Sequence, residues 1–202
     1  GYFGQRMADV AARTGAAVRI VEAPFGEVIP PERIEEELKR RPAKLVALVH
    51  AETSTGAEQP LAEIAEIAHR HGALIAVDAV TSLGGMPVPV DEWGIDAAAS
   101  CSQKCLGAPP GLSPVTFGPR AMEAIAARKS SCGSWYLDLN LLFAYWGDGK
   151  ANTRVFHHTG PISMIYAFRE ALRIVLEEGL EQRFERHRKA HRAFVAGIEA
   201  MG

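Results

Sequence analysis

Leu45-Val46-Ala47-Leu48-Val49-His50 and Ala73-Leu74-Ile75-Ala76-Val77-Asp78 are the stretches that decide the fold of this chain. Both are apolar almost throughout instead of alternating, which is typical of strands buried on both faces of a parallel sheet. The segment between them begins at Pro60, ends at Gly72 and has apolar residues at helical spacing: Leu61, Ile64, Ala65 and Ala68. Strand, helix and strand with short connections predict a right-handed βαβ unit. The fold is therefore expected to be α/β, with a mostly parallel sheet between helices.

Hydrophobic periodicity predicts further elements on both sides of this unit. Helices are expected over 5–14, 30–41, 119–129, 135–146, 161–178 and 180–201. Short strands are expected over 17–21, over 115–117 and in the apolar run that leads to Lys104, with a turn over 91–95 before that run.

Composition and charge exclude several classes of protein. The chain has 202 residues, of which 48% are hydrophobic and 23% charged, so it can bury a core. A net charge of −2 with no long basic cluster argues against a nucleic-acid partner. No apolar run reaches the roughly 18 residues of a membrane span, and no signal segment opens the chain, so no membrane association is expected. Three irregularly spaced cysteines fit a reducing, cytoplasmic location. Because the chain begins at Gly1 without a methionine, we interpret it as an internal piece of a longer protein.

Polar segments follow three of the predicted strands, over 52–56, 78–81 and 102–104. The carboxyl ends of parallel strands meet at one edge of a sheet, where α/β proteins bind ligands. Lys104 is the only lysine between Lys44 and Lys129, and a lysine near apolar surface can act as an amine nucleophile. Asp78 directly follows a buried strand, so its carboxylate is expected to need a cationic or hydrogen-bonding partner.

Each of these residues also has a purely structural interpretation. Lys104 alone would usually be a surface lysine in a loop. Asp78 could cap a helix or form a structural ion pair, and Thr53 could simply cap its loop. Together, however, an amine nucleophile, a partly buried carboxylate and hydroxyl donors describe a pyridoxal 5'-phosphate site, with the lysine on carbon C4′ and the aspartate on the ring nitrogen.

The sequence resembles the class V aminotransferases of fold type I, and within them the alanine/serine–glyoxylate aminotransferases. The resemblance extends over nearly the whole chain and rests on six motifs in order: His50-Ala51-Glu52-Thr53-Ser54-Thr55-Gly56, Val77-Asp78-Ala79-Val80-Thr81-Ser82-Leu83-Gly84-Gly85, Asp91-Glu92-Trp93-Gly94-Ile95-Asp96, Ser102-Gln103-Lys104-Cys105-Leu106, Trp135-Tyr136-Leu137-Asp138 and His157-His158-Thr159. It implies that residues 1–178 are part of the large cofactor-binding domain, whose N-terminal portion is missing, and that residues 179–202 begin a small C-terminal domain.

The resemblance also implies a role for each matching position. Lys104 matches the lysine that binds the cofactor covalently and moves the substrate proton, and Asp78 matches the carboxylate on the pyridine nitrogen. Three further positions match residues against the ring face, the phenolic oxygen and the phosphate: Val80, Thr53 and Gln103. Thr159 matches a phosphate ligand offered to the neighbouring subunit, which implies a homodimer with shared active sites.

The implied reaction moves an amino group from alanine or serine to glyoxylate, giving glycine and pyruvate or hydroxypyruvate. Two alternatives stay open. A cysteine desulfurase-like lyase shares the fold but typically has histidine before the lysine, where this chain has Gln103. A truncated paralogue without activity would act as a binding module.

Two positions depart from the family pattern. Phe156 stands where the family usually has tyrosine, and Cys101 stands where it has glycine. The family's N-terminal phosphate turn and the arginine that binds the substrate carboxylate are expected to lie outside this chain. Cys101 with Cys105, and His157 with His158, could be read as metal ligands, but we expect no metal: adjacent histidines tend to point apart, and no second cysteine pair exists.

Overall fold

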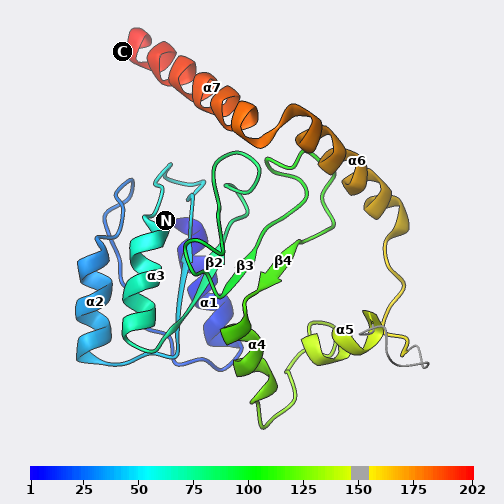
Figure 1. Ribbon diagram of the computed structural model, residues 1–202. Coiled ribbons are helices and arrows are strands. Elements are labelled where there is room, and N and C mark those ends of the chain that lie inside the picture. Colours follow the sequence, from blue (N-terminus) through cyan, green and yellow to red (C-terminus); the bar gives the residue numbers. More distant parts are fainter. Residues whose placement is uncertain (147–154) are drawn as a thin grey trace.

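The computed structural model describes residues 1–146 and 155–202 (Figure 1). Its elements follow the order α1 (Tyr2–Arg13), α2 (Pro31–Arg40), β1 (Leu45–Val49), α3 (Leu61–Arg70), β2 (Leu74–Asp78), β3 (Ala97–Ala99), β4 (Val115–Phe117), α4 (Pro119–Ala126), α5 (Leu139–Trp146), α6 (Ile162–Glu178) and α7 (Leu180–Met201). No helix of these ranges is both long and apolar enough to cross a membrane.

The sheet has the strand order β1-β2-β3-β4 and confirms the predicted fold class. The first three strands are parallel, and β4 closes the edge in the antiparallel sense. In the ladder Val49 pairs with Asp78, and Asp78 pairs with Ala99. The ends of β1, β2 and β3 are therefore level with one another, and the segments that follow them leave the sheet at the same edge.

The core lies between the sheet and the helices of the βαβ unit. Ile64, Ala65 and Ala68 of α3 have no solvent exposure, and neither has Ile75 of β2. Ile34 and Leu38 of α2 extend the same cluster. Burial of this stripe explains why the helical spacing in the sequence predicted α3 correctly.

Two predicted elements differ in the structure. Residues 17–21 form no strand, although their composition favours one, because no strand within the described ranges lies beside them to complete a ladder. Arg19 instead donates to Glu37 at 2.6 Å and to the Arg41 carbonyl at 2.6 Å. Helix α5 begins at Leu139 instead of Trp135, because the preceding residues form a turn in which Leu137 N–H donates to Ser134 Oγ.

A buried carboxylate holds the amino-terminal side of the sheet together. Asp96 is 4% exposed and precedes β3. Its Oδ2 accepts from the Ile75 amide at 2.8 Å and lies 2.9 Å from His69 Nε2 on α3. The Asp96 carbonyl accepts from Gly118 N–H, just before α4, at 2.7 Å. One residue thus connects β2, α3 and α4.

Replacing Asp96 by alanine should destabilise the full-length protein by about 2 to 3 kcal/mol, because it leaves the buried Ile75 amide without an acceptor. The urea unfolding midpoint measures the loss. Glu92→Ala, at an exposed position of the preceding turn, is the matched control and should stay within about 0.5 kcal/mol of wild type. Equal stability of the two variants would contradict the role of Asp96.

Candidate active site

The segments after β1, β2 and β3 converge at the carboxyl edge of the sheet, as the sequence predicted. Thr53 Oγ1 and Thr81 Oγ1 lie 2.8 Å apart and share a hydrogen bond, which joins the first two segments. Ser100 Oγ donates to the Ala79 carbonyl at 3.0 Å and joins the second to the third. The structure therefore brings the predicted site residues Thr53, Asp78, Val80, Gln103 and Lys104 to one edge.

Asp78 is a half-buried carboxylate at the end of β2. Its Oδ1 accepts from the Val80 amide at 2.8 Å, which also fixes Val80 beside it. Burial raises the pKa of Asp78, and the nearby negative charge of Glu52 raises it further, although the Val80 hydrogen bond opposes the rise. No ion pair to Asp78 occurs within the described ranges. This environment fits a carboxylate that receives its cationic partner from a ligand, such as a protonated ring nitrogen.

Lys104 and Gln103 lie in the turn that follows β3, and both side chains are exposed. Gly107 N–H donates to the Lys104 carbonyl at 3.0 Å, and Ala108 N–H donates to the Ser102 carbonyl at 2.9 Å. Ser102 has no solvent exposure, and its hydroxyl donates to the Pro109 carbonyl at 2.6 Å. The buried serine anchors the turn so that the next two side chains project from it, and the described residues do not enclose Lys104 in apolar surface.

The turn packs closely on the segment that follows Asp78, and glycines make this possible. A Cβ atom on Gly85 would lie 2.6 Å from Cys105 Sγ, and one on Gly84 would lie 2.9 Å from Leu106 Cδ2. Gly84 also has φ +84°, in the left-handed region that glycine adopts freely. The glycine pair belongs to a family motif, but its role in this contact was not predicted from the sequence.

Both cysteines beside the lysine contact backbone carbonyls of the same segment. Cys105 Sγ lies 3.3 Å from the Thr81 carbonyl, and Cys101 Sγ lies 3.9 Å from the Val80 carbonyl. Burial raises the pKa of the Cys105 thiol, so it stays protonated and can donate. Cys101, the departure from the family's glycine, is thus accommodated as a small buried thiol.

Glu52 has a role that sequence reasoning missed. Its carboxylate accepts from the Gly4 amide at 3.1 Å and from the Phe3 amide at 3.3 Å, in the first turn of α1. Burial disfavours the ionised carboxylate, but the hydrogen bonds from Ser54, Gly4 and Phe3 outweigh it and lower the pKa of Glu52. These hydrogen bonds connect the Glu52–Ser54 segment to the start of α1. The run of Ser and Thr beside Glu52 in the sequence could have indicated that this carboxylate is hydrogen-bonded.

Thr159 lies apart from the other predicted site residues. It is exposed, in the irregular segment that leads into α6 (Figure 1), and no hydrogen bond within the described ranges joins it to the segments after β2 or β3. In the same segment Phe156 is 72% exposed, whereas His157 is buried and stacks on Trp135 at 4.2 Å between ring centroids. The expectation that the adjacent histidines point apart is wrong, because their Nδ1 atoms lie 2.8 Å from each other. Stacking on Trp135 holds the His157 ring with its Nδ1 toward His158.

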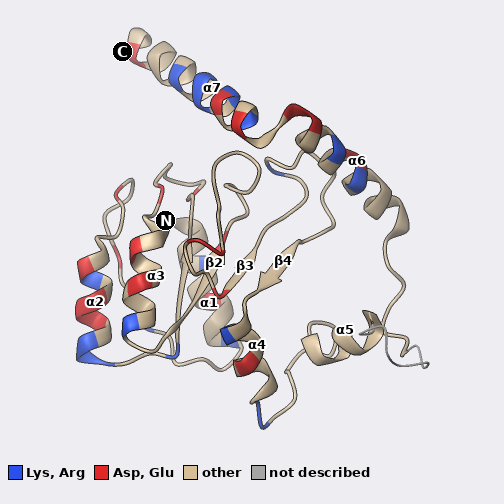
Figure 2. Cartoon of the chain, viewed as in Figure 1, with Lys and Arg blue, Asp and Glu red and all other residues tan. Residues whose placement is uncertain are grey.

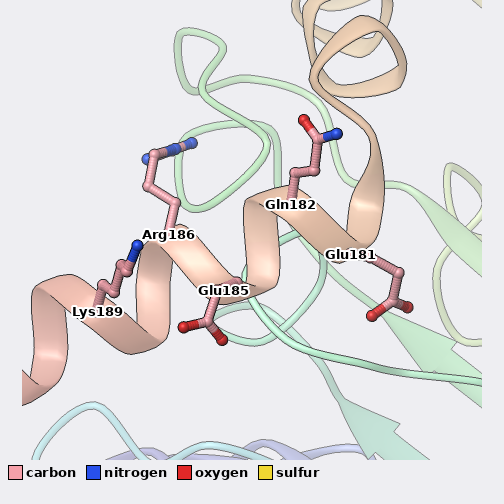
Figure 3. Close-up of a pocket in the computed structure, with 5 residues that line it drawn as sticks. All are labelled: Glu181, Gln182, Glu185, Arg186 and Lys189. Carbon is pink, nitrogen blue, oxygen red and sulfur yellow. The ribbon is translucent and has the colours of Figure 1, made fainter.

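A separate hollow of about 530 Å³ lies along α7 (Figure 3). All of its lining residues belong to that helix: Glu181, Gln182, Glu185, Arg186 and Lys189. Charges of both signs alternate there (Figure 2). Since neither Asp78 nor Lys104 lines it, the candidate site is the sheet edge and not this hollow.

A family model, "Aminotransferase class-V", matches residues 5–202. The chain belongs to the class V aminotransferase family. Proteins of this family take pyridoxal phosphate as cofactor. The Asp78 carboxylate, which has no ion pair among the described residues, and the exposed amine of Lys104 fit that group.

Relatives within the class V aminotransferases cover all of this chain. It is 44% identical to the (S)-ureidoglycine–glyoxylate transaminase of Bacillus subtilis (strain 168) and 41% identical to the alanine–glyoxylate aminotransferase of Mus musculus, covering 52% and 49% of those proteins. The crystal structure of an alanine–glyoxylate aminotransferase from Nostoc sp. superposes with a TM-score of 0.95 at 48% identity, over 100% of this chain and 52% of that one. The chain thus spans about half the length of the curated relatives it matches.

Asp78→Asn should stabilise the cofactor-free, full-length protein at neutral pH. The raised pKa of Asp78 means that the folded protein holds its proton more tightly than the unfolded chain does, so the stability it contributes at low pH is lost as the pH rises through that pKa. Asparagine never ionises and keeps an oxygen for the Val80 amide. The gain should therefore vanish toward acid pH in urea unfolding, whereas Asp91→Asn, at an exposed position, should show neither effect. A destabilised Asp78→Asn apoprotein at neutral pH would contradict this account.

Proposed function

We propose that the whole protein is a pyridoxal phosphate-dependent transaminase that moves an amino group from alanine or serine to glyoxylate, giving glycine and pyruvate or hydroxypyruvate. The observation that carries the proposal is the half-buried Asp78 carboxylate, without an ion pair in the described ranges, on the strand beside the one that leads to Lys104. The relatives named for glyoxylate support the acceptor.

Each site residue then has a distinct task. With the cofactor bound, Asp78 would keep the ring nitrogen protonated, and Val80, whose amide donates to Asp78, would pack against the ring. Lys104 binds the cofactor covalently and carries the substrate proton. Thr53 would contribute a hydroxyl near the phenolic oxygen, and Gln103 would bind the phosphate. The cofactor, when bound, supplies an electron sink for the developing carbanion.

The alternative functions receive less support. A desulfurase would typically place histidine before the lysine, and Gln103 stands there. A non-catalytic binding module gives no account of the half-buried Asp78 carboxylate, which has no ion pair in the described residues, because burying such a charge costs stability. The relatives also name two different amino donors, alanine and (S)-ureidoglycine, so both belong in the test.

We propose in addition that the protein is a homodimer with shared active sites. Large apolar side chains around α5 are exposed, among them Trp135, Trp146 and Phe156. Such a patch is typical of an interface. We also propose a large domain that includes residues 1–178 and a small domain that begins at 179, where Gly179 breaks the helix with φ +80°. A reducing, cytoplasmic location fits the three free cysteines.

The full-length protein should form glycine from glyoxylate, in equal amount with the 2-oxo acid of the donor. Alanine, serine and (S)-ureidoglycine are compared as donors, and cysteine serves as the control for sulfur release. After borohydride reduction, mass spectrometry should find the pyridoxyl group on Lys104, and Lys104→Ala should remove it. Alanine and persulfide from cysteine as main products would support the desulfurase instead, and the absence of any turnover or label would support the non-catalytic paralogue.

Phe156→Tyr should raise cofactor affinity about tenfold, because a hydroxyl at this position would add a hydrogen bond to the charged phosphate. Phe143→Tyr, at another exposed phenylalanine of this region, controls for the added hydroxyl and should leave affinity unchanged. Thr159→Ala should lower affinity by a similar or smaller factor. Fluorescence titration of the apoprotein measures all three dissociation constants.

Mixed dimers then test whether sites are shared. A dimer of one Lys104→Ala subunit and one Thr159→Ala subunit should keep one site of full affinity, because the intact lysine faces the intact threonine of the other subunit. If the sites are not shared, the remaining site has its own altered threonine and binds weakly. Full affinity would then appear only when both substitutions are on the same subunit.

A further inference from the structure

Arg183 connects helix α7 to both segments that carry the candidate catalytic residues. It is only 9% exposed, although it belongs to the first turn of a helix rich in charge. Its Nε donates to the Gly84 carbonyl at 2.9 Å, and another guanidinium nitrogen donates to the Cys105 carbonyl. Gly84 belongs to the segment that follows Asp78, and Cys105 directly follows Lys104. Figure 1 shows the start of α7 beyond the carboxyl edge of the sheet, next to these loops.

The guanidinium is held in place from its other side. Arg183 donates to Glu178 Oε2 at 2.5 Å, at the end of α6. Arg186 also donates to Glu178, and its hydrogen bond, followed by that of Arg183, holds the pKa of Glu178 at about 2. The acid is therefore ionised across the physiological range, and the buried cation has a permanent partner. A buried charge needs such pairing.

The planar guanidinium suits a bridge between two carbonyls. Arginine presents its N–H groups in a rigid, planar fork. Two of its three nitrogens can therefore donate to the two carbonyls while the third, Nη1, donates to the Glu178 carboxylate. Near the strand ends, the Ala79 amide donates to the Ala99 carbonyl and Ser100 donates to the Ala79 carbonyl. Closer to Lys104, among the described residues, only the thiols of Cys101 and Cys105 hydrogen-bond across to the segment besides Arg183, and thiols are weak donors. Gly84 and Gly85 have no side chains of their own, so Cys105 and Leu106 pack directly on their backbone, and a guanidinium that grips both backbones fixes the position of the turn on that segment.

We propose that Arg183 is a positioning residue: it sets the turn that presents Lys104 at a fixed distance from the segment that presents Asp78. The proposal rests on the proposed function for the roles of these two residues, but the bridge itself is independent of it. A shift of about 1 Å in a reacting group can cost about 10²-fold in rate. The catalytic lysine is thus oriented from a helix that we assign to the next domain.

Two substitutions and one control in the full-length protein test the bridge. Arg183→Ala removes it. Arg183→Lys keeps the charge and the pairing with Glu178 but cannot span both carbonyls. Arg188→Ala removes another arginine of α7, one that is exposed and pairs with Glu185 within the helix, and it serves as the matched control.

The first measurement is hydrogen–deuterium exchange of the apoprotein over residues 102–108, whose amides include those of Gly107 and Ala108. We expect exchange several-fold faster in both Arg183 variants and unchanged in Arg188→Ala. The second measurement uses the holoenzyme: kcat should fall by up to about 10²-fold with a much smaller change in KM. The pH midpoint of the cofactor's visible absorption should shift, because it reports the environment of the lysine nitrogen. A purely stabilising role would lower the unfolding temperature without moving that midpoint.

Wild-type exchange rates over 102–108 in Arg183→Lys, or an unmoved spectral midpoint together with unchanged kcat, would overturn the proposal. If Arg183→Ala does not fold, the exchange rates and the spectral midpoint of Arg183→Lys alone decide whether the bridge positions the turn. If the wild-type protein shows no transamination at all, the proposed function fails, while the exchange experiment still decides whether Arg183 positions the turn.

Discussion

The parallel ladder of β1, β2 and β3 is the constraint on which the rest of the structure depends. Val49, Asp78 and Ala99 are neighbours across it, so the three strands end level and their following segments meet. A slip of one residue would turn Asp78 to the other face of the sheet. Burial of Ile75 on one side and the Asp96 hydrogen bond to its amide prevent that slip. The position of the candidate site is therefore a consequence of how the core packs.

The segment after β2 is held in place through its backbone carbonyls. Ser100 donates to the carbonyl of Ala79, the thiols of Cys101 and Cys105 contact those of Val80 and Thr81, and Arg183 donates to that of Gly84. All of these donors come from the turn around Lys104 or from α7. These contacts fix the backbone of the segment, and of its side chains Thr81 pairs with Thr53 while the Asp78 carboxylate keeps one oxygen for a ligand. That carboxylate has only the Val80 amide as partner in the described part of the chain.

Charge is distributed accordingly. Asp96, on the amino-terminal side of the sheet, is paired with His69 and with a backbone amide. Asp78, on the opposite side, has no cationic partner among the described residues, and its pKa is raised. The first arrangement stabilises the fold, and the second lowers stability until a cationic ligand is bound. Two aspartates at opposite ends of the strands, one before β3 and one at the end of β2, thus have opposite effects on stability because their surroundings differ.

The sequence by itself determined the βαβ unit, the convergence of three polar segments and the motifs that indicate the family, because local periodicity and residue order carry that information. Tertiary structure alone decided the rest. Residues 17–21 look like a strand but lack a neighbour to pair with, and strand pairing depends on residues distant in sequence. Arg183 looks like one more charge on an amphipathic helix, and its bridge spans 78 and 99 residues of sequence to Cys105 and Gly84. Only folding brings such partners together, and no local pattern encodes a hydrogen bond to a backbone carbonyl that every residue possesses.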